Sequence, residues 1–492
     1  MKDLKEKTIR GGLARLAAQG ANFALRTGSM MVLARLLNPK DFGLVGMVTA
    51  FTGFLSLFRD FGLSSAAIQR ASVTEEQVST LFWINMFVGA ILGIAAVAMA
   101  PVIAAFYHEP RLLAVTVVLA SGFLFNAAGV QHGVLLQRQL RFTALAIINT
   151  LALVVGTAIA IGGALAGYGY WSLVAMTIAL PLVTTIGSWV TSGWVPGKPR
   201  RQSGIRSMMR FGGGITLYGL ISYVGTNFEK VLLGRFWGSD ALGLYGRAYQ
   251  LINIPTDNLN FAAGEVAFPA LSRIQDEPVR LKNYFLKGYA LVLAMTLPIT
   301  VLCALFAEDM ILVLLGPKWS AAVPIFRLLA PTILVFAIVN PLGWLLCSTG
   351  RVGRLLKMAL VTTPFMIAGY FAGLPYGPRG VACAYSLLML LWILPAIAWA
   401  VNGTGITVWD IALTVRSPLV AGTVAALSAL GVRWSYGRFL SPLPRLIIES
   451  IVMLAVYASM LVFATGQKSF YLEVFRSLRS TSSVDRNDLV SA

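Results

Sequence analysis

The sequence predicts an all-α membrane protein of about fourteen transmembrane helices, built as two related six-helix lobes followed by two further helices. Of its 492 residues, 57% are hydrophobic and 12% are charged, whereas a soluble protein carries about 25% charged residues. Apolar runs of about 20 to 28 residues recur along the chain, which is long enough to cross a hydrocarbon layer of about 30 Å as helices. An internal repeat supplies the third observation.

The repeat relates Leu33–Met47, LARLLNPKDFGLVGM, to Leu233–Arg247, LGRFWGSDALGLYGR. At a shift of 200 residues five pairs are identical, where an apolar composition would give about one. The pairs are Leu33/Leu233, Arg35/Arg235, Gly43/Gly243, Leu44/Leu244 and Gly46/Gly246. In each copy a short polar link separates two apolar segments, so we predict two helical hairpins that turn at a membrane surface and enter the bilayer in the same direction.

The predicted spans are residues 12–36, 42–68, 78–105, 112–136, 142–167, 170–194, 211–236, 241–271, 284–307, 320–348, 355–374, 378–401, 412–433 and 443–466. Residues 1–194 therefore form an N-terminal lobe, 195–210 a basic link between lobes, and 211–401 a second lobe. Two extra helices occupy 402–466, and 467–492 form a tail. Thr74 to Gln77 resembles a capping box that begins the third span.

Lys and Arg residues predict the orientation. With the N-terminus inside, the inner links hold 23 of them against 7 in the outer links, so both termini are expected in the cytoplasm. The net charge of +19 is then explained by anchoring to anionic membrane lipids. A nucleic-acid partner is not expected, because such a partner needs a basic face on a soluble domain.

Metal, cofactor and enzymatic chemistry are not expected. Cys303, Cys347 and Cys383 are odd in number and lie in or near apolar spans, as small core residues do. His108, in an outer turn, and His132, in a polar patch, are isolated and have no ligand spacing. The sequence contains no phosphate loop, no HExxH motif and no large loop outside the membrane, so we predict no catalytic residues and a transporter rather than an enzyme.

Polar residues of the first span share one helix face. Arg15, Gln19, Asn22 and Arg26 follow at i, i+4, i+7 and i+11. An arginine at mid-membrane costs about 2.5 to 3.5 kcal/mol, so this face predicts a water-filled cavity or a partner, although Arg15 could also extend to the inner surface. Shifted by 200, the face of Gln19, Asn22, Arg26 and Ser29 becomes Gly219, Ser222, Thr226 and Glu229, again small or polar.

The second copy adds further candidates. Glu229 and Lys230 lie in the seventh span, and Arg247, Gln250, Asn253 and Asp257 recur at near-helical spacing in the eighth, where Pro255 predicts a broken helix. Arg327 repeats the pattern in the tenth span, and Arg59 is a candidate inner-gate residue. We predict a cationic cavity that binds an anionic amphiphile through Asn22, Arg26, Lys230, Arg247 and Arg327. Glu229 and Asp257 are the candidates for binding a coupling cation.

Several stretches together resemble the polysaccharide transporter family of the multidrug/oligosaccharidyl-lipid/polysaccharide (MOP) flippase superfamily, near the Wzx-type and colanic-acid-type exporters. They are LARLLNPKDFGLVGM, DFGLSSAAIQR with VTEEQVSTLFWIN, LLQRQLRFTALA, FEKVLLGRFWGSDALGLYGRAYQL and LGPKWSAAVPIFRLLAP. The resemblance covers residues 1 to 400, and the family often has Asp where this chain has Glu229.

The resemblance implies a multi-pass protein of the bacterial inner membrane that flips a polyprenyl-pyrophosphate-linked oligosaccharide repeat unit to the periplasmic leaflet by alternating access. The product would be exopolysaccharide, capsule or the O-antigen of lipopolysaccharide, and a polysaccharide polymerase and a chain-length regulator are candidate partners. Export of a peptidoglycan precursor or of drugs is an alternative, although a drug exporter should have an acidic cavity. A membrane-bound sugar polymerase or ligase is a further alternative, although such enzymes usually need a large outer loop.

Overall fold

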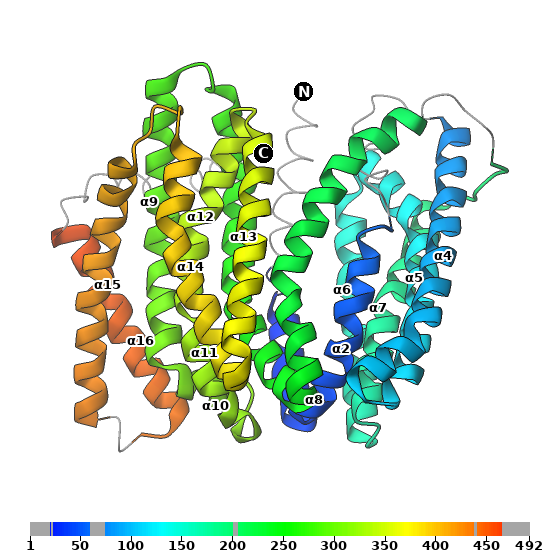
Figure 1. Cartoon of the computed structure of the whole chain (residues 1–492), viewed down its shortest axis with the longest axis horizontal. Helices are drawn as coiled ribbons and strands as arrows, with labels where there is room; N and C mark the ends of the chain where they lie inside the picture. Colours follow the sequence, from blue (N-terminus) through cyan, green and yellow to red (C-terminus); the bar gives the residue numbers. More distant parts are fainter. Residues whose placement is uncertain (1–19, 21–22, 60–73, 200–204, 437–439, 465–492) are drawn as a thin grey trace, which may run out of the picture. The chain divides into compact units, whose positions relative to one another are not determined.

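The computed structural model of the protein describes residues 20, 23–59, 74–199, 205–436 and 440–464. Within these ranges the chain is helical and contains no strand, and helices occupy every predicted span that the ranges cover. The predicted all-α, polytopic fold is therefore confirmed (Figure 1).

A first helix covers residues 23–36. It is followed by α2 (Pro39–Ser56), α4 (Glu75–Tyr107), α5 (Arg111–Arg138), α6 (Phe142–Leu165), α7 (Tyr170–Ser192), α8 (Ile205–Arg273), α9 (Pro278–Leu305), α10 (Ala307–Leu314), η1 (Pro317–Ala322), α11 (Val323–Leu329), α12 (Pro331–Ser348), α13 (Val352–Gly373), η2 (Leu374–Tyr376), α14 (Gly377–Val401), α15 (Val408–Tyr436), α16 (Pro442–Ser459) and η3 (Met460–Ala464).

Local chemistry explains several helix ends. The predicted capping box at the start of α4 is confirmed, because the Gln77 backbone N–H donates to the Thr74 hydroxyl and the Thr74 N–H donates to the Gln77 side chain. The seventh and eighth spans share the label α8 but are two helices that meet at a kink at Gly238, whose φ of 78° lies outside the helical range. The predicted short link at Gly238 to Asp240 therefore begins at this kink. The break predicted at Pro255 is wrong, since α8 continues through that residue.

Nine stretches of the described residues are long and apolar enough to cross a membrane, and one of them, Val352–Val401, covers two predicted spans. The four predicted spans that are not among them are the two copies of the first hairpin. The second copy lies in α8, which is described along its whole length and fails by composition, not by length. The second hairpin is thus more polar than the spans among these nine stretches.

Contacts between Cα atoms divide the chain into two compact units. Unit 1 comprises residues 1–247, 314–321 and 359–384, and unit 2 comprises residues 248–313, 322–358 and 385–492. These units are a different partition from the two sequence-related lobes, whose boundaries at 194 and 401 remain a prediction.

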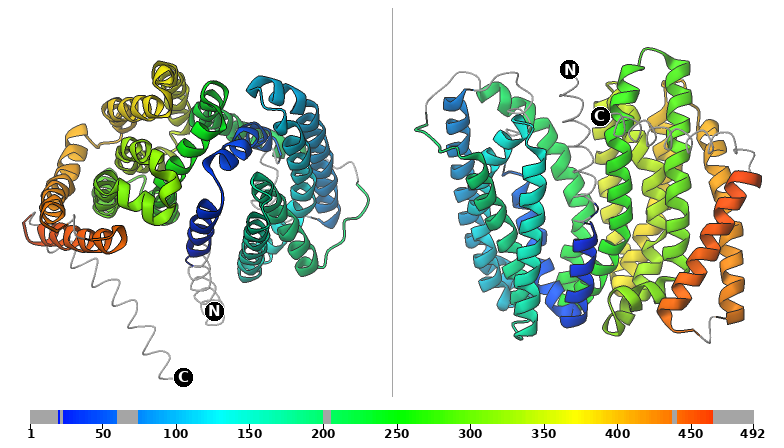
Figure 2. Two further views of the ribbon diagram at one scale, coloured as in Figure 1. Left: turned by 90° about the horizontal axis from the view of Figure 1, so that it is seen from below. Right: turned by 180° about the vertical axis from the view of Figure 1, so that it is seen from behind.

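In unit 1, helices α4 to α7 pack side by side through small residues (Figures 1 and 2). A Cβ added at Gly89 of α4 would lie 2.6 Å from the Ala127 side chain of α5, and one added at Gly187 of α7 would lie 2.9 Å from Ile148 of α6. Membrane helices gain little from the hydrophobic effect, so close backbone approach of this kind supplies their packing energy.

An aromatic cluster holds the start of the link after α7. The His132 ring stacks on Trp189 with centroids 4.2 Å apart, and its Nε2 lies 3.2 Å from the Trp194 carbonyl oxygen. The Gly197 backbone N–H donates to the Ser79 hydroxyl at 3.0 Å. His132 is thus a structural residue of the N-terminal lobe, and the described residues contain no cluster of three or more potential metal ligands.

In unit 2, buried tyrosines join α9 to its neighbours. Tyr289 donates to the Ile338 carbonyl oxygen of α12 at 3.0 Å, and Tyr457 of α16 donates to the Ala294 carbonyl oxygen at 3.0 Å. A Cβ at Gly422 of α15 would overlap the Leu297 side chain of α9. The two helices that have no counterpart in the repeat therefore pack directly on a helix of the second repeat.

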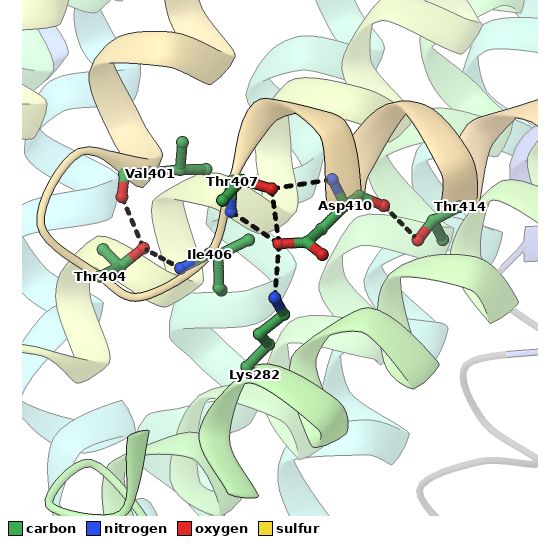
Figure 3. Close-up of polar contacts among 7 residues, drawn as sticks. All are labelled: Lys282, Val401, Thr404, Ile406, Thr407, Asp410 and Thr414. Carbon is green, nitrogen blue, oxygen red and sulfur yellow. Dashed lines mark hydrogen bonds and ion pairs between the residues drawn. The ribbon is translucent and has the colours of Figure 1, made fainter. Parts of the chain in front are cut away.

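Ion pairs reinforce that attachment at both ends of α15. At one end, Asp309 of α10 is fully buried, pairs with Arg445 of α16 and lies 3.7 Å from the Arg433 guanidinium of α15. At the other end, the Asp410 carboxylate accepts from Lys282 of α9 at 2.7 Å and from the backbone N–H of Thr407 at 2.8 Å (Figure 3). Asp410 thereby caps α15 and fixes it to α9.

We expect Asp309→Ala to lower the free energy of unfolding of the purified protein by about 3 kcal/mol, because it leaves two arginines at a buried site without their carboxylate. Denaturant titration measures this loss. Glu308→Ala is the control: the Glu308 carboxylate is 53% exposed and 3.9 Å from Arg433, so its removal should cost about 0 to 1 kcal/mol. Equal losses in the two variants would contradict the assigned role of Asp309.

Candidate functional site

The two repeated hairpins contact each other within unit 1. Gly43 of the first copy lies so close to Ser239 that an added Cβ would overlap its carbonyl oxygen, and Gly243 of the second copy lies equally close to the carbonyl oxygen of Pro39. Positions 39 and 239, like 43 and 243, are equivalent in the repeat. The two copies therefore cross backbone against backbone at matching residues.

A polar seam runs along the first half of α8, where it packs on α2 and α13. The Tyr223 hydroxyl donates to the Ala50 carbonyl oxygen of α2 at 2.9 Å, and the Tyr370 hydroxyl of α13 donates to the Gly225 carbonyl oxygen at 2.9 Å. An added Cβ at Gly53 would overlap the Tyr223 hydroxyl. Two tyrosines thus fix the position of α8 between its neighbours.

Glu229 and Lys230 lie in this seam but turn to different surroundings, as the helical spacing predicts. Glu229 is 1% exposed, and neither carboxylate oxygen accepts a hydrogen bond from the described part of the chain. Lys230 is half-buried and donates to the Asn227 side chain at 2.6 Å. A buried carboxyl without hydrogen-bond donors is costly as an anion, and the candidate role of Glu229 in binding a coupling cation remains a prediction.

Arg247 ends the second copy and lies against the first. Its guanidinium carbon is 3.9 Å from the centroid of the Phe42 ring, in a cation–π contact. Phe42 in turn packs edge-on against Trp319, whose indole N–H donates to the Ala34 carbonyl oxygen at 2.8 Å. Arg247, which is predicted to bind substrate, therefore packs on Phe42 of the other hairpin.

The remaining predicted residues are placed as follows. Arg26 is exposed on the helix of residues 23–36, in unit 1. Asp257 of α8 and Arg327 of α11 are exposed residues of unit 2. Asn22, like Arg15 and Gln19, lies outside the described residues. The structure thus brings Glu229 and Lys230 into one seam, and the proposed set as a whole remains a prediction.

Arg59, the candidate inner-gate residue, donates to the Asn126 side chain of α5 at 3.1 Å. This contact joins the end of the second span to the fourth span within the same lobe, which gives Arg59 a structural partner. Its proposed role in gating is a separate prediction.

Sequence reasoning missed the residues that connect the seam. Tyr223 and Tyr370 have ordinary positions in apolar segments, and their partners are carbonyl groups, which no side-chain pattern reveals. Two sequence features do point to the position of Tyr223. It comes shortly before the polar run TNFEK, and the residue that faces it on α2 is a glycine, Gly53.

The fold matches that of a solved membrane-protein structure. The chain superimposes on the solved structure described as "Lipid II flippase MurJ, inward closed conformation" with a TM-score of 0.74, over 95% of this chain and 100% of that one, at 14% sequence identity. The chain shares the fold of that structure, and the protein is a multi-pass membrane protein.

The family is shown by sequence. Residues 32–324, more than half of the chain, match the family described as polysaccharide biosynthesis protein, and the protein belongs to it. It is 27% identical over 395 residues to the "Lipopolysaccharide biosynthesis protein WzxC" of Escherichia coli (strain K12), which covers 79% of this chain and 80% of that protein. It is 24% identical over 438 residues to the "Succinoglycan biosynthesis transport protein ExoT" of Rhizobium meliloti (strain 1021), which covers 88% and 87%.

We expect Tyr223→Phe to lower the free energy of unfolding by about 0.5 to 1.5 kcal/mol, the usual net contribution of one hydrogen bond. Denaturant titration of the purified protein measures it. Tyr376→Phe serves as the control, because Tyr376 is 78% exposed and its hydroxyl remains accessible to water. No difference between the variants would mean that the Tyr223 hydroxyl does not stabilise the seam.

Proposed function

We propose that the protein is a flippase that moves a polyprenyl-pyrophosphate-linked oligosaccharide repeat unit across the bacterial inner membrane, for synthesis of exopolysaccharide, capsule or O-antigen. The observation that carries this proposal is the combination of a flippase fold with membership of the polysaccharide biosynthesis protein family. The succinoglycan relative is described as a transport protein, which supports transport of a polysaccharide precursor rather than its polymerisation.

The hairpins suit an anionic amphiphile. They are the most polar spans of an otherwise apolar bundle, and they carry Arg26, Lys230 and Arg247. Guanidinium and ammonium groups make strong charge-assisted hydrogen bonds to phosphate oxygens. The pyrophosphate and sugars of the substrate would occupy a polar cavity, while the polyprenyl tail stays in the lipid. Asn22 and Arg327 complete the proposed set.

Two lobes related by a parallel repeat can rock about a central site and expose it to each side in turn. Energy for uphill export would come from a coupled proton or cation. Glu229 is our first candidate for that site, since it is buried without a donor, and Asp257 is the second. The distribution of Lys and Arg supports cytoplasmic termini. A polysaccharide polymerase and a chain-length regulator are the proposed partners at the periplasmic surface.

The test is the pool of lipid-linked oligosaccharides in a strain that lacks this gene. We expect mass spectrometry to find complete repeat units. In right-side-out vesicles these units should be protected from added glycosidase, because they lie on the cytoplasmic leaflet. Complete units that accumulate on the periplasmic leaflet would assign the protein to polymerisation or ligation instead. Accumulation of the peptidoglycan precursor alone would favour that substrate, which the lipid II flippase fold keeps as the second candidate.

We expect Arg26→Ala and Arg247→Ala each to lower polysaccharide export by about 10- to 100-fold, because a hydrogen bond to a charged group contributes about 1.5 to 3 kcal/mol. Export is measured as polymer per cell at equal protein level in the membrane. The control is Arg280→Ala, which removes a surface arginine whose side chain is 68% exposed and pairs with Glu277 at the start of its helix. Normal export from both cavity variants would remove these residues from the substrate site.

We expect Glu229→Gln to keep the protein folded and to abolish the dependence of export on the coupling ion, because the amide has the shape of the carboxyl but cannot exchange a proton or bind a cation by charge. Transport in vesicles is measured against imposed proton and sodium gradients. Glu265→Gln, on an exposed side chain of α8 beyond the Gly238 kink, is the matched control. Unchanged coupling in Glu229→Gln would assign the role to another carboxyl.

A further inference from the structure

A cluster of charged residues lies within unit 2, where α15 ends and α16 begins. Asp309 of α10 is fully buried; its carboxylate accepts from the Arg445 Nε of α16 at 3.0 Å and lies 3.7 Å from the Arg433 guanidinium of α15. The Glu308 carboxylate, 53% exposed, lies 3.9 Å from Arg433. With two positive and two negative charges, these four groups are neutral together, and the arginines need no further carboxylate.

Glu449 is a fifth charged residue in the same cluster. It lies one helical turn after Arg445 in α16 and is 1% exposed. Neither of its carboxyl oxygens has a hydrogen-bond partner in the described part of the chain, and the same holds for Oδ2 of Asp309. A buried carboxyl without hydrogen-bond donors is costly as an anion. A neutral carboxyl needs only an acceptor for its proton, and the Asp309 Oδ2 atom is an acceptor within the cluster.

The surroundings of Glu449 contain no other source of charge in the described helices that pack on α16. The charged groups that act on it electrostatically are Arg433 of α15, Asp309 of α10 and Arg445 of its own helix. The remaining neighbour is α9. Residues 290–305 of α9 carry no charge, and their one titratable side chain is Cys303, which is 2% exposed. The charge on Glu449 therefore depends on the two arginines that Asp309 already holds.

Arg445 has two candidate carboxylate partners. Glu449 follows it by four residues in the same helix, the spacing at which side chains of opposite charge meet on one helix face. In the structure Arg445 instead reaches across to Asp309 of α10. Arg433 lies close enough to hold Asp309 when Arg445 leaves. The cluster can thus pair in two ways, with both arginines at Asp309 or with one arginine at each carboxylate.

We propose that Glu449 is a proton-binding site that acts as a latch for α16. With the proton bound, Glu449 is neutral, and Arg445 ties α16 to Asp309 of α10. When the proton passes to water, the buried carboxylate takes Arg445 as its partner within α16, and this tie is broken. The contact of α16 with α9 at Tyr457 remains, so the opening is local. The latch uses no residue assigned to substrate or cation binding and stands independently of the proposed function.

The first experiment asks whether Glu449 holds a proton. A protonated carboxyl has an infrared C=O stretch that an ionised carboxylate lacks, so difference spectra of the purified full-length protein detect it. We expect this band at neutral pH in the spectrum of the wild type minus Glu449→Gln. The matched control, the wild type minus Glu308→Gln, should lack the band, because Glu308 is 53% exposed beside an arginine. Absence of the band from the first spectrum would overturn the proposal.

Asp309→Asn tests the competition for the arginines. The amide keeps the shape of the Asp309 side chain without its charge, so both arginines become available to Glu449. An opposite charge close to a carboxyl favours its ionised form. We therefore expect the infrared band of Glu449 to disappear in Asp309→Asn at the same pH. A band that persists would show that the arginines do not pass from one carboxyl to the other, and it would overturn the latch.

The third experiment measures the attachment of α16 and does not depend on how well Asp309→Asn folds. Met453, one turn beyond Glu449, is fully buried. Met453→Cys, in a protein whose three native cysteines are replaced, reacts with N-ethylmaleimide when α16 loosens. Its rate is divided by that of the same protein carrying Glu449→Gln, which shares the pH dependence of the thiol but stays neutral.

We expect this ratio of rates to rise by about tenfold between about pH 6 and pH 8, because only the carboxylate of Glu449 opens the latch and it forms as the pH rises. The amount of folded protein is kept equal in the two variants. A ratio that is constant with pH would show that Glu449 does not govern the attachment of α16, and the proposal would then be wrong.

Discussion

The close approach of two backbones, at Gly43 and Gly243, is the constraint on which unit 1 depends. Each glycine leaves room for a carbonyl group of the other copy, so any side chain at either position would push the hairpins apart. This contact determines which way α2 and the first half of α8 face, and hence where the polar seam with Tyr223 and Glu229 lies. The absence of a Cβ at two equivalent positions, Gly43 and Gly243, thus positions the candidate site.

The repeat could be found in the sequence, and several of its identical positions lie where the two copies touch. Gly43/Gly243 make the crossing, and Leu33/Leu233 are buried beside it. The class of fold, the span positions and the capping box at Thr74 also followed from hydropathy and spacing, which are local properties. The family followed from longer stretches of the same sequence, and it is shown.

Other features depend on contacts that no pattern along the chain contains. The carbonyl partners of Tyr223 and Tyr370 lie on other helices, and Asp309 finds Arg445 from 136 residues away. Pro255 misled in the opposite sense: a proline removes one hydrogen bond, but the second helix of α8 continues through it, and the kink lies at Gly238, where the repeat predicts the hairpin link. Charged residues in spans were found by periodicity, whereas their partners required the folded structure.

The attachment of Gly197 to the first lobe limits the distance between that lobe and the start of α8. Gly197 is fixed by Ser79 and also accepts the Trp83 indole N–H at 2.9 Å, and α8 begins at Ile205. A chain of eight residues reaches at most about 28 Å when fully extended. The covalent connection therefore limits how far this end of the first lobe can move from the start of α8. The range of any rocking motion thus has an upper bound that is set by chain length and is independent of substrate size.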